Sequence, residues 1–470
     1  MRIALVNTNR LIPPIAPIGL DYVSQALRAA GHEVALLDLC WADDWPAAVS
    51  AFFGATEVQL VGLTLRNTDD CMLSGCRSYV DEFAAMVDHV RRHAGAPLVV
   101  GGVGFSVMPR LVLAHCGADW GVHGDGEQPL VELAGRLERG QAWSDVPGLV
   151  WPEPSGWRAN PPGGWRLDIL PPMRRDGVDN PRYFRQGGQV GFETRRGCPG
   201  ACIYCADPLA RGSMVRLRPA PAVADEVEAL VSQGITHLHT CDGEFNLPVE
   251  HARAVCRELI RRGLGERIRW YAYCAPAPFP ADLAALMRQA GCAGVNFGAD
   301  SGDAEMLRRL GRGFGPEAIA RAVEACRQAG LATMLDLLLG GPGETQASLR
   351  TTIEFVRRVR PDRAGVSLGV RVYPGTELAR QVARQTGGAG LLGGPDPVRP
   401  LYYLDPAVAP FASELLGRLI GGDPLFFYAP AGADRDYNYS DNQVLVQAIA
   451  RGYRGAYWDI LRRLAEGLPA

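Results

Sequence analysis

Residues 195–205 read Arg195-Arg196-Gly197-Cys198-Pro199-Gly200-Ala201-Cys202-Ile203-Tyr204-Cys205. Three cysteines therefore lie on one short loop, close enough together to bind a single metal centre. Thiolate ligands select zinc or iron–sulfur clusters. A structural zinc site needs a fourth cysteine or histidine, and the nearest histidine along the chain is His237. Three thiolates suit a [4Fe–4S] cluster in which one iron stays open, so the segment predicts such a cluster on Cys198, Cys202 and Cys205.

The residues around this loop alternate between short apolar runs and helical patterns. Strands are predicted at Val190–Thr194, His237–Cys241, Ile268–Tyr273, Gly294–Gly298, Thr333–Leu339 and Gly365–Val370. The helical patterns are Ala220–Gln233, Val249–Arg262, Ala281–Ala290 and Pro316–Ala329, each followed by the glycine that often ends a helix. Six strand–helix units are fewer than the eight of a closed barrel. Residues 187–375 are therefore expected to form a partial (β/α)6 barrel.

The N-terminal third shows the same alternation. Strands are predicted at Arg2–Val6, Glu33–Leu37, Gln59–Leu65 and Leu98–Gly101, with a helix at Ile18–Ala30. Strands separated by helices in this rhythm indicate an open parallel sheet. Ligands of such sheets bind at the carboxyl ends of the strands. Residues 1–145 are therefore expected to form a Rossmann-like α/β domain.

The remaining two segments show no strand–helix repeat. Residues 146–186 are rich in proline, glycine and tryptophan, which indicates a linker that includes a short hairpin. Residues 376–470 carry many aromatic side chains and a helical pattern at Gln443–Arg451. We expect them to form a mostly helical cap over the open side of the barrel, with most of the aromatic rings in its core.

Composition limits the possible partners and location. Hydrophobic residues make up 47% and charged residues 21% of the 470 residues, and the formal net charge is −3. No basic run stands out, so neither nucleic acid nor an anionic membrane is an expected partner. No apolar run approaches the ~20 residues of a membrane span, and the first residues resemble a strand rather than a secretory signal. A cytoplasmic protein is expected. Most of its other cysteines, such as Cys256 and Cys326, are expected to be small buried apolar residues.

The spacing Cys-x3-Cys-x2-Cys, with Tyr204 before the last cysteine, resembles the radical S-adenosylmethionine (SAM) superfamily. The resemblance extends across the predicted barrel. It implies that SAM chelates the open iron and that one electron from the cluster cleaves SAM to a 5′-deoxyadenosyl radical. It also implies that Tyr204 lies against the adenine.

Further elements of the barrel resemble the SAM-binding motifs of that superfamily. Asp242-Gly243-Glu244 ends the second strand and is similar to a Gly-Gly-Glu element that binds the SAM ammonium group, where a carboxylate makes a charge-assisted bond. The resemblance places Asp300 and Ser301 near the ribose and Arg312 near the SAM carboxylate, although a solvated loop is an equal interpretation. Gly340 and Gly341 are similar to an adenine-contact element, and turn formation also explains them.

The N-terminal domain resembles the cobalamin-binding domain of B12-type radical SAM enzymes. Three segments are similar. They are Pro17-Ile18-Gly19-Leu20, Gly101-Gly102-Val103-Gly104 after a predicted strand, and Gly124-Asp125-Gly126-Glu127. The residues that the resemblance assigns to cobalamin are Leu65, Arg66, Asn67, Gly101, Gly102, Val103, Gly104, Phe105, Gly124, Asp125, Gly126 and Glu127. A domain of this shape can also serve only for packing or substrate enclosure, so cobalamin stays an open prediction.

One departure concerns the cobalt. The Asp-x-His-x-x-Gly signature that places histidine on cobalt is absent, and the third strand ends in Leu65-Arg66-Asn67 instead. A similar run occurs in relatives that resemble the tryptophan 2-methyltransferase, where an arginine faces the cobalt from below. An uncoordinated cobalt would favour transfer of a methyl group. The competing interpretation of Arg66 is an ion pair at the surface or between domains.

Three functions are compatible with these patterns. The first is cobalamin-dependent C-methylation of a small molecule or peptide, in which a natural product is the expected substrate. The second is cobalamin-independent radical dehydration of an amino-sugar diol, as in the aminoglycoside 3′-deoxygenating enzymes, with acidic cap residues Asp423, Asp434, Asp436 and Asp441 suited to such a substrate. The third, a sensor or structural cluster, leaves Glu244 and the glycine loop unexplained. We favour methylation.

The candidate catalytic residues lie in the cap and the first domain. Tyr437, Asn438, Tyr439 and Asp441 are candidates for substrate contact, because Asn438 alternates with the two tyrosines in a way that suits a pocket wall. An ordinary turn before the last helix is equally compatible, and Arg66 is a further candidate. No flavin or second-cluster motif is present, so we expect flavodoxin or ferredoxin to donate the electron.

Overall fold

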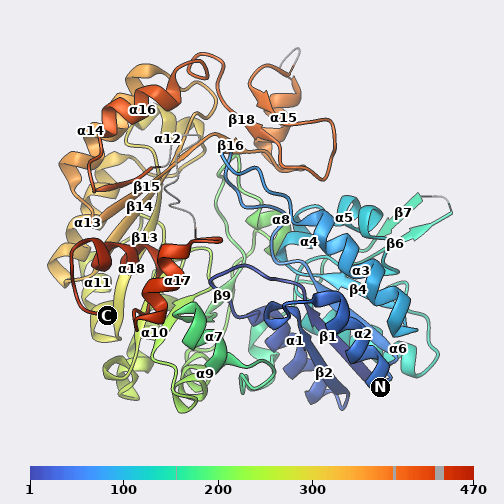
Figure 1. Cartoon of the computed structure of the whole chain (residues 1–470). Helices are drawn as coiled ribbons and strands as arrows, with labels where there is room; N and C mark the ends of the chain where they lie inside the picture. Colours follow the sequence, from blue (N-terminus) through green and yellow to red (C-terminus); the bar gives the residue numbers. More distant parts are fainter. Residues whose placement is uncertain (155, 385–387, 429–438) are drawn as a thin grey trace.

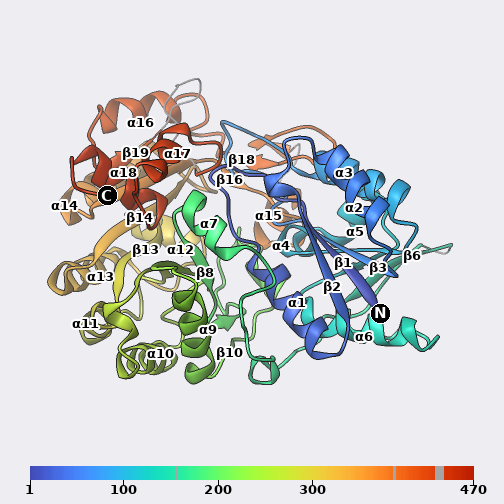
Figure 2. The ribbon, with the colours of Figure 1, turned by 60° about the horizontal axis from the view of Figure 1, so that its bottom comes forward.

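The computed structural model describes residues 1–154, 156–384, 388–428 and 439–470. Two seven-stranded sheets dominate it, one in the N-terminal part and one in the barrel. Figures 1 and 2 show these two parts side by side, with the chain termini on opposite sides of the molecule. The α/β class with a Rossmann-like domain followed by a barrel is therefore confirmed.

The N-terminal sheet has the strand order β2-β1-β3-β4-β5-β6-β7. Its strands are β1 (Arg2–Asn7), β2 (Glu33–Asp38), β3 (Leu60–Thr64), β4 (Leu98–Gly101), β5 (Trp120–Val122), β6 (Leu149–Glu153) and β7 (Gly156–Ala159). The helices are α1 (Ile18–Ala29), α2 (Trp45–Ala55), α3 (Val80–Ala94), α4 (Val103–Val107), α5 (Pro109–Cys116) and α6 (Glu127–Glu138). Strands β1 to β5 are parallel, as predicted.

Strands β6 and β7 correct the expected extent of the linker. They form the predicted hairpin, but β6 pairs antiparallel with β5 and so extends the first sheet beyond residue 145. The division of the chain at 1–145, 146–186, 187–375 and 376–470 remains a proposal.

The second sheet has the order β19-β15-β14-β13-β12-β11-β8, and all its pairs are parallel. Its strands are β8 (Val190–Phe192), β11 (His237–Thr240), β12 (Arg269–Cys274), β13 (Cys292–Asp300), β14 (Ala332–Leu339), β15 (Arg363–Leu368) and β19 (Phe426–Phe427). The helices that follow are α9 (Ala220–Ser232), α10 (Val249–Arg261), α11 (Ala281–Gln289), α12 (Ala304–Arg309), α13 (Pro316–Ala329) and α14 (Gln346–Val359). The six predicted strands are present, and β19 adds a short seventh.

Helices are the main regular structure of the C-terminal region, although fewer than half of its described residues are helical, so the expected mostly helical cap is only partly found. It contains α15 (Glu377–Arg384), α16 (Ala412–Ile420), α17 (Gln443–Ala450) and α18 (Tyr457–Ala465). Strand β18 (Tyr402–Tyr403) pairs on one side with β16 (Val370–Arg371) and on the other with β17 (Leu391–Leu392). Helix α17 packs against α7 (Asn180–Gly187) of the connecting segment (Figure 2). Trp458 of α18 is buried against Tyr271 of β12, with ring centroids 5.9 Å apart. Within the described residues, no helix is long and apolar enough to span a membrane.

A buried ionic cluster joins the two halves. Arg175 of the connecting segment donates to Asp21 of α1 (2.7 Å) and to Glu226 of α9 (2.6 Å), and all three side chains are fully buried. Tyr22 of α1 also donates to Glu226, at 2.8 Å. Burial alone would lower the pKa of Arg175, but these two carboxylates raise it above its ordinary value. The cluster fixes α1, and with it one wall of the space between the domains.

Candidate functional site

The cysteine loop is held by backbone contacts on both sides. It follows β9 (Arg195–Arg196), which pairs with β10 (Arg216–Leu217). The Cys198 amide donates to the Gly212 carbonyl (3.1 Å), and the Ile203 amide donates to the Leu310 carbonyl (3.1 Å). Gly197 has a φ of +85°, and a Cβ there would lie 2.1 Å from the Met214 carbonyl oxygen. Only glycine fits that position, so the loop geometry follows from the local sequence.

Glycine leaves space beside the sulfur atoms of the loop. A Cβ on Gly200 would lie 3.3 Å from the Cys198 sulfur and 3.7 Å from the Cys202 sulfur, so glycine keeps the space beside both sulfurs open. Within the described residues, no three histidine, cysteine or acidic side chains converge on a point where one metal ion could bind. Burial raises the pKa of Cys205 to about 12, so metal binding there must displace a proton.

The residues predicted to bind SAM meet beside Cys202. Arg312 donates to the Cys202 sulfur (3.0 Å), to the Tyr204 hydroxyl (3.3 Å) and to the Gly298 carbonyl (2.6 Å). The Tyr204 hydroxyl donates to Asp300 at 2.6 Å. Tyr204, Asp300 and Arg312 therefore form one network that touches a cluster ligand. The solvated-loop interpretation does not fit Asp300, which is 5% exposed.

The two acidic residues that follow β11, Asp242 and Glu244, have different surroundings. Burial raises the pKa of Glu244 to about 7, although Arg312 and Arg195 both lower it. Asp242 requires a correction, because its carboxylate accepts from the Thr194 amide (2.8 Å), the Thr194 hydroxyl (2.7 Å) and the Arg195 amide (3.1 Å). Its side chain fixes the turn before the cluster loop and is not available to SAM.

Three other predicted SAM residues are explained by packing. Ser301 is 1% exposed and its hydroxyl hydrogen-bonds the Thr352 hydroxyl at 2.9 Å, so its side chain is not available to the ribose. Gly340 has a φ of +88°, and a Cβ there would lie 2.3 Å from Leu404. A Cβ on Gly341 would lie 3.0 Å from Leu310. Turn formation and close packing account for both glycines.

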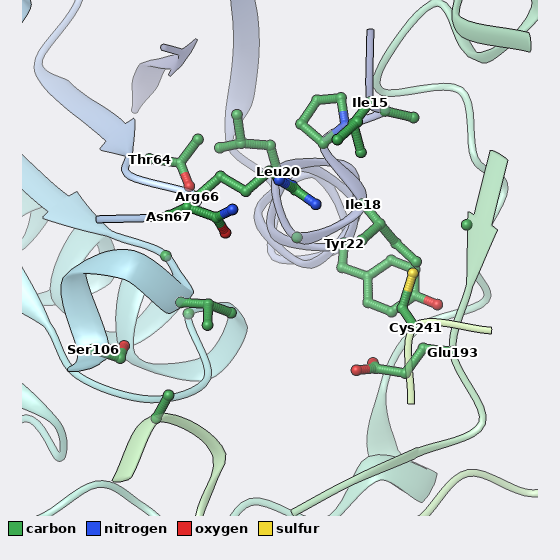
Figure 3. Close-up of a pocket in the computed structure, with 18 of the residues that line it drawn as sticks. Ile15, Ile18, Leu20, Tyr22, Thr64, Arg66, Asn67, Ser106, Glu193 and Cys241 are labelled. Carbon is green, nitrogen blue, oxygen red and sulfur yellow. The ribbon is translucent and has the colours of Figure 1, made fainter. Parts of the chain in front are cut away.

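A cavity of about 690 Å³ lies between the N-terminal domain and the barrel. Figure 3 shows residues on its walls from four parts of the chain: Leu20 and Tyr22 of α1, Arg66 and Asn67 after β3, Ser106 of α4, and Glu193 and Cys241 of the barrel. The cavity also reaches Asp207 and Gly243, which are close to the cluster loop. One space therefore connects the predicted cobalamin residues with the region that is predicted to bind SAM.

Arg66 lies on the wall that the N-terminal domain provides. Within the described residues it has no carboxylate partner, which disfavours the ion-pair interpretation. Its carbonyl accepts from Asn67 (2.9 Å), and its guanidinium donates to the Asn67 amide oxygen (3.2 Å). Burial lowers the pKa of Arg66, whereas Tyr439 and Cys241 oppose that effect. Of the eight histidines, His239 of the barrel is the one that lines this cavity.

The glycine-rich run after β4 positions Arg66. The Gly104 amide donates to the carbonyls of Leu65 and Arg66, both at 3.0 Å. A Cβ on Gly102 would lie 2.4 Å from the Leu65 carbonyl oxygen, and a Cβ on Gly104 would lie 2.8 Å from the Asn67 carbonyl carbon. These glycines therefore let two backbone segments of the protein meet, and their contact with a ligand is indirect.

Gly104→Ala tests this role of the glycine. The added Cβ must push the Asn67 backbone aside, so we expect a loss of about 1–3 kcal/mol in unfolding free energy, as overpacking typically causes. We also expect roughly tenfold weaker cobalamin binding, because a displacement that costs about 1.4 kcal/mol changes affinity by that factor. Denaturant unfolding of the apoprotein and cobalamin titration would measure the two effects.

Gly54→Ala in α2 provides the matched control, because a Cβ there would meet no atom within 4 Å apart from its chain neighbours and the backbone of its own helix. It should leave cobalamin binding unchanged and stabilise the helix by roughly 0.5–1 kcal/mol. Equal behaviour of the two variants would contradict the positioning role of Gly104.

The other predicted cobalamin residues fall into two groups. Gly101, Gly102, Val103, Gly124, Asp125, Gly126 and Glu127 line the cavity together with Arg66 and Asn67. Leu65 and Phe105 are 3% and 0% exposed and belong to the core of the N-terminal domain. Their assignment to cobalamin is corrected: a Cβ on Gly121 would lie 2.0 Å from the Phe105 ring, which shows how tightly that ring is enclosed.

The two acidic residues of this set bind arginines of the cluster segment. Glu127 accepts from Arg196 at 2.6 and 3.0 Å, and Asp125 lies 3.3 Å from the same guanidinium. Asp125 also pairs with Arg216. Although burial opposes it, Arg196 and Arg216 hold the pKa of Asp125 below its ordinary value. These carboxylates therefore tie the first domain to the cluster loop.

The candidate catalytic residues of the cap do not all reach the cavity. Tyr437 and Asn438 lie outside the described residues. Tyr439 lines the cavity, and its ring meets Tyr457 edge-on at 5.9 Å. Asp441 requires a correction, because its carboxylate pairs with Arg77 and its amide donates to the Ile12 carbonyl (2.6 Å). It connects the C-terminal region to the N-terminal domain.

Several cavity residues escaped the sequence-based prediction. Tyr22 and Glu193 lie on the wall, as do His239 and Tyr273 of the barrel strands. His239 and Tyr273 could have been identified from the sequence, because polar side chains recur at every second position of their strands.

Comparison with known proteins confirms the two predicted domain types. The profile of the radical SAM superfamily matches residues 192–356, and that of the B12 binding domain matches residues 7–134. The tryptophan 2-C-methyltransferase of Streptomyces laurentii is 32% identical, over 97% of this chain and 95% of that protein.

Two solved structures are similar over the whole chain. The radical SAM methyltransferase TsrM from Kitasatospora setae, with tryptophan substrate and a SAM analogue bound, has a TM-score of 0.91 at 33% identity, covering 99% of both chains. The same enzyme with cobalamin and a [4Fe–4S] cluster bound has a TM-score of 0.89 at 30% identity, covering 99% of this chain and 98% of that one.

Proposed function

The chain belongs to the cobalamin-dependent radical SAM methyltransferases, and we propose that it methylates a ring carbon of tryptophan or of a small molecule built on tryptophan. The prediction of a [4Fe–4S] cluster, SAM and cobalamin as cofactors is confirmed by this membership. The indole substrate is supported by the relatives named for, or bound to, tryptophan.

The cavity is the observation that carries this proposal. It runs without interruption from Arg66 and Asn67 on the first domain to Asp207 and Gly243 beside the cluster loop. At about 690 Å³ it falls within the roughly 300–1,000 Å³ typical of small-molecule sites. A substrate in this space would have access to groups bound at both ends.

When bound, SAM supplies the methyl group, cobalamin relays it to the substrate, and the cluster supplies electrons. The chain's own residues hold these groups. Glu244 and Arg312 provide opposite charges for the ammonium and carboxylate groups of SAM, and Tyr204 is fixed by Asp300 for contact with the adenine. Arg66 presents a guanidinium where related domains present histidine, and Asn67 keeps it in place.

Dehydration without cobalamin is the less favoured alternative. It assigns no role to the cavity wall around Arg66, and its acidic cap residue Asp441 is paired with Arg77 outside the cavity. We also propose a cytoplasmic location and a flavodoxin or ferredoxin as electron donor. Both proposals rest on the sequence.

Anaerobic reconstitution with iron, sulfide and hydroxocobalamin, followed by incubation with SAM, a reductant and L-tryptophan, tests the function. We expect one cobalamin per chain and a product heavier than tryptophan by one methyl group, with the label of methyl-deuterated SAM retained. Cobalamin binding without methylation of any indole in a substrate panel would contradict the proposed substrate. Release of 5′-deoxyadenosine with loss of water from a diol would support dehydration instead.

A further inference from the structure

Four polar side chains form a row across the inner face of the barrel, one on each of the strands β11 to β14. They are His239, Tyr273, Asn296 and Asp336. Their neighbours along the strands, such as Val295, Phe297, Leu335 and Leu337, belong to the outer hydrophobic core under the helices. Because successive side chains of a strand point to opposite faces, the polar row faces the barrel interior.

The row connects the two ends of the site. His239 and Tyr273 line the cavity between the domains. Burial and the charge of Asp336 raise the pKa of Tyr273, whereas a hydrogen bond with Asn296 and the charge of Arg66 oppose that rise. At the other end, the charge of Asp300 acts on Asp336. The row therefore reaches from the Arg66 side of the cavity to the network of Tyr204, Asp300 and Arg312.

Asn296 and Asp336 hold acceptor atoms that have no donor. Asn296 donates to one Asp336 carboxylate oxygen at 2.8 Å. The other Asp336 oxygen and the Asn296 amide oxygen are both buried without a hydrogen-bond partner. A buried acceptor that stays unpaired is costly, so two on neighbouring strands indicate that something else supplies donors.

The electrostatics at Asp336 indicate the missing partner. Burial raises the pKa of this carboxyl to about 7, and the like charge of Asp300 acts in the same direction. Among the described residues, no cationic side chain forms an ion pair with Asp336. A ligand that brings both hydrogen-bond donors and a positive charge would satisfy this position, and a primary ammonium group has both.

We propose that Asp336, together with Asn296, binds the ammonium group of the substrate and so selects amino-acid-like or amine substrates. This inference rests on the proposed function, since it extends the same site from His239 and Tyr273 on the cavity wall to Asn296 and Asp336, which do not line the cavity themselves. His239 and Tyr273 then lie along the substrate on the side of the cavity. Asp336 would position the substrate and take no part in bond formation.

Dissociation constants of two matched ligands test the contact. L-Tryptophan carries the ammonium group, and indole-3-propionate has the same skeleton without it. In the reconstituted enzyme we expect Asp336→Asn to weaken tryptophan binding roughly tenfold to a hundredfold, as loss of a charge-assisted bond does, and to leave indole-3-propionate binding unchanged. With tryptophan as substrate, KM should rise while kcat stays close to that of the unmodified enzyme.

Two further variants make the result interpretable. Asn296→Ala should weaken tryptophan binding in the same selective manner, by less than Asp336→Asn does. Asp362→Asn serves as the control, because that carboxylate accepts from the Thr333 amide (2.8 Å) at the start of β14 and away from the polar row. It should not change the affinity ratio of the two ligands. Iron and cobalamin contents would verify that each variant is folded.

Each alternative outcome has a definite meaning. Equal weakening of both ligands by Asp336→Asn, or no weakening, would overturn the inference. If the unmodified enzyme binds neither indole, the proposed substrate is wrong, and phenethylamine becomes the probe. Binding of that amine, lost in Asp336→Asn, would support the ammonium contact, and failure to bind it would overturn the contact as well.

Discussion

Replacing Cys198, Cys202 and Cys205 together by alanine should yield a folded protein that lacks the brown absorption of the cluster, binds no cluster iron and transfers no methyl group. The three sulfurs are the ligands that the loop offers, and their removal leaves nothing to hold a cluster there. The fold should persist, because the loop is anchored by backbone bonds from Cys198 to Gly212 and from Ile203 to Leu310. Iron and sulfide analysis, visible absorption and SAM turnover would measure the outcome.

The control for this variant is Cys76→Ala. Cys76 is exposed and lies outside the cluster loop, so this change should leave iron content and turnover unchanged. A triple variant that keeps its full iron load and its SAM cleavage would contradict the assignment of the cluster to these cysteines. Loss of helical circular dichroism in the triple variant would instead show that the cluster is needed for folding.

Most of the barrel could be predicted because its strands and helices are set by local patterns. Strands such as Ala332–Leu339 are short apolar runs, and helices such as Pro316–Ala329 begin with proline and end before a glycine. Strand β19 could not be predicted, because it has two residues and exists only through its pairing with β15. Pairing between distant segments leaves little trace in a single sequence.

The sequence does not predict which partner the side chain of a motif residue contacts. The motif assigns Gly104 and Glu127 to cobalamin, yet Gly104 accommodates the Asn67 backbone and the Glu127 carboxylate binds Arg196. A sequence shows that glycine or a carboxylate is present but does not show its partner. Asp336 was missed for the opposite reason: it lies in an apolar strand with no motif around it. Its strand position nevertheless places it inside the barrel.

Arg175→Met should destabilise the protein by about 3–5 kcal/mol, because it leaves Asp21 buried without a cation and removes one of the two arginines that pair with Glu226, the other being Arg218. Arg175 is 0% exposed and contacts Asp21 at 2.7 Å and Glu226 at 2.6 Å. Methionine is similar in length and apolar, so the change tests charge more than volume. Denaturant unfolding of the reconstituted enzyme, followed by tryptophan fluorescence, would measure the loss.

The neighbouring residue offers a matched control. Arg174 is exposed, so Arg174→Met should change stability by no more than about 0.5 kcal/mol, as surface substitutions usually do. Because Asp21 and Tyr22 belong to α1 and Glu226 to α9, loss of Arg175 should also loosen the cavity wall at Tyr22 and weaken cobalamin retention. A variant that loses stability but keeps cobalamin would show that the cluster supports the fold alone. Equal stability of the two variants would contradict the claim that these buried charges hold the domains together.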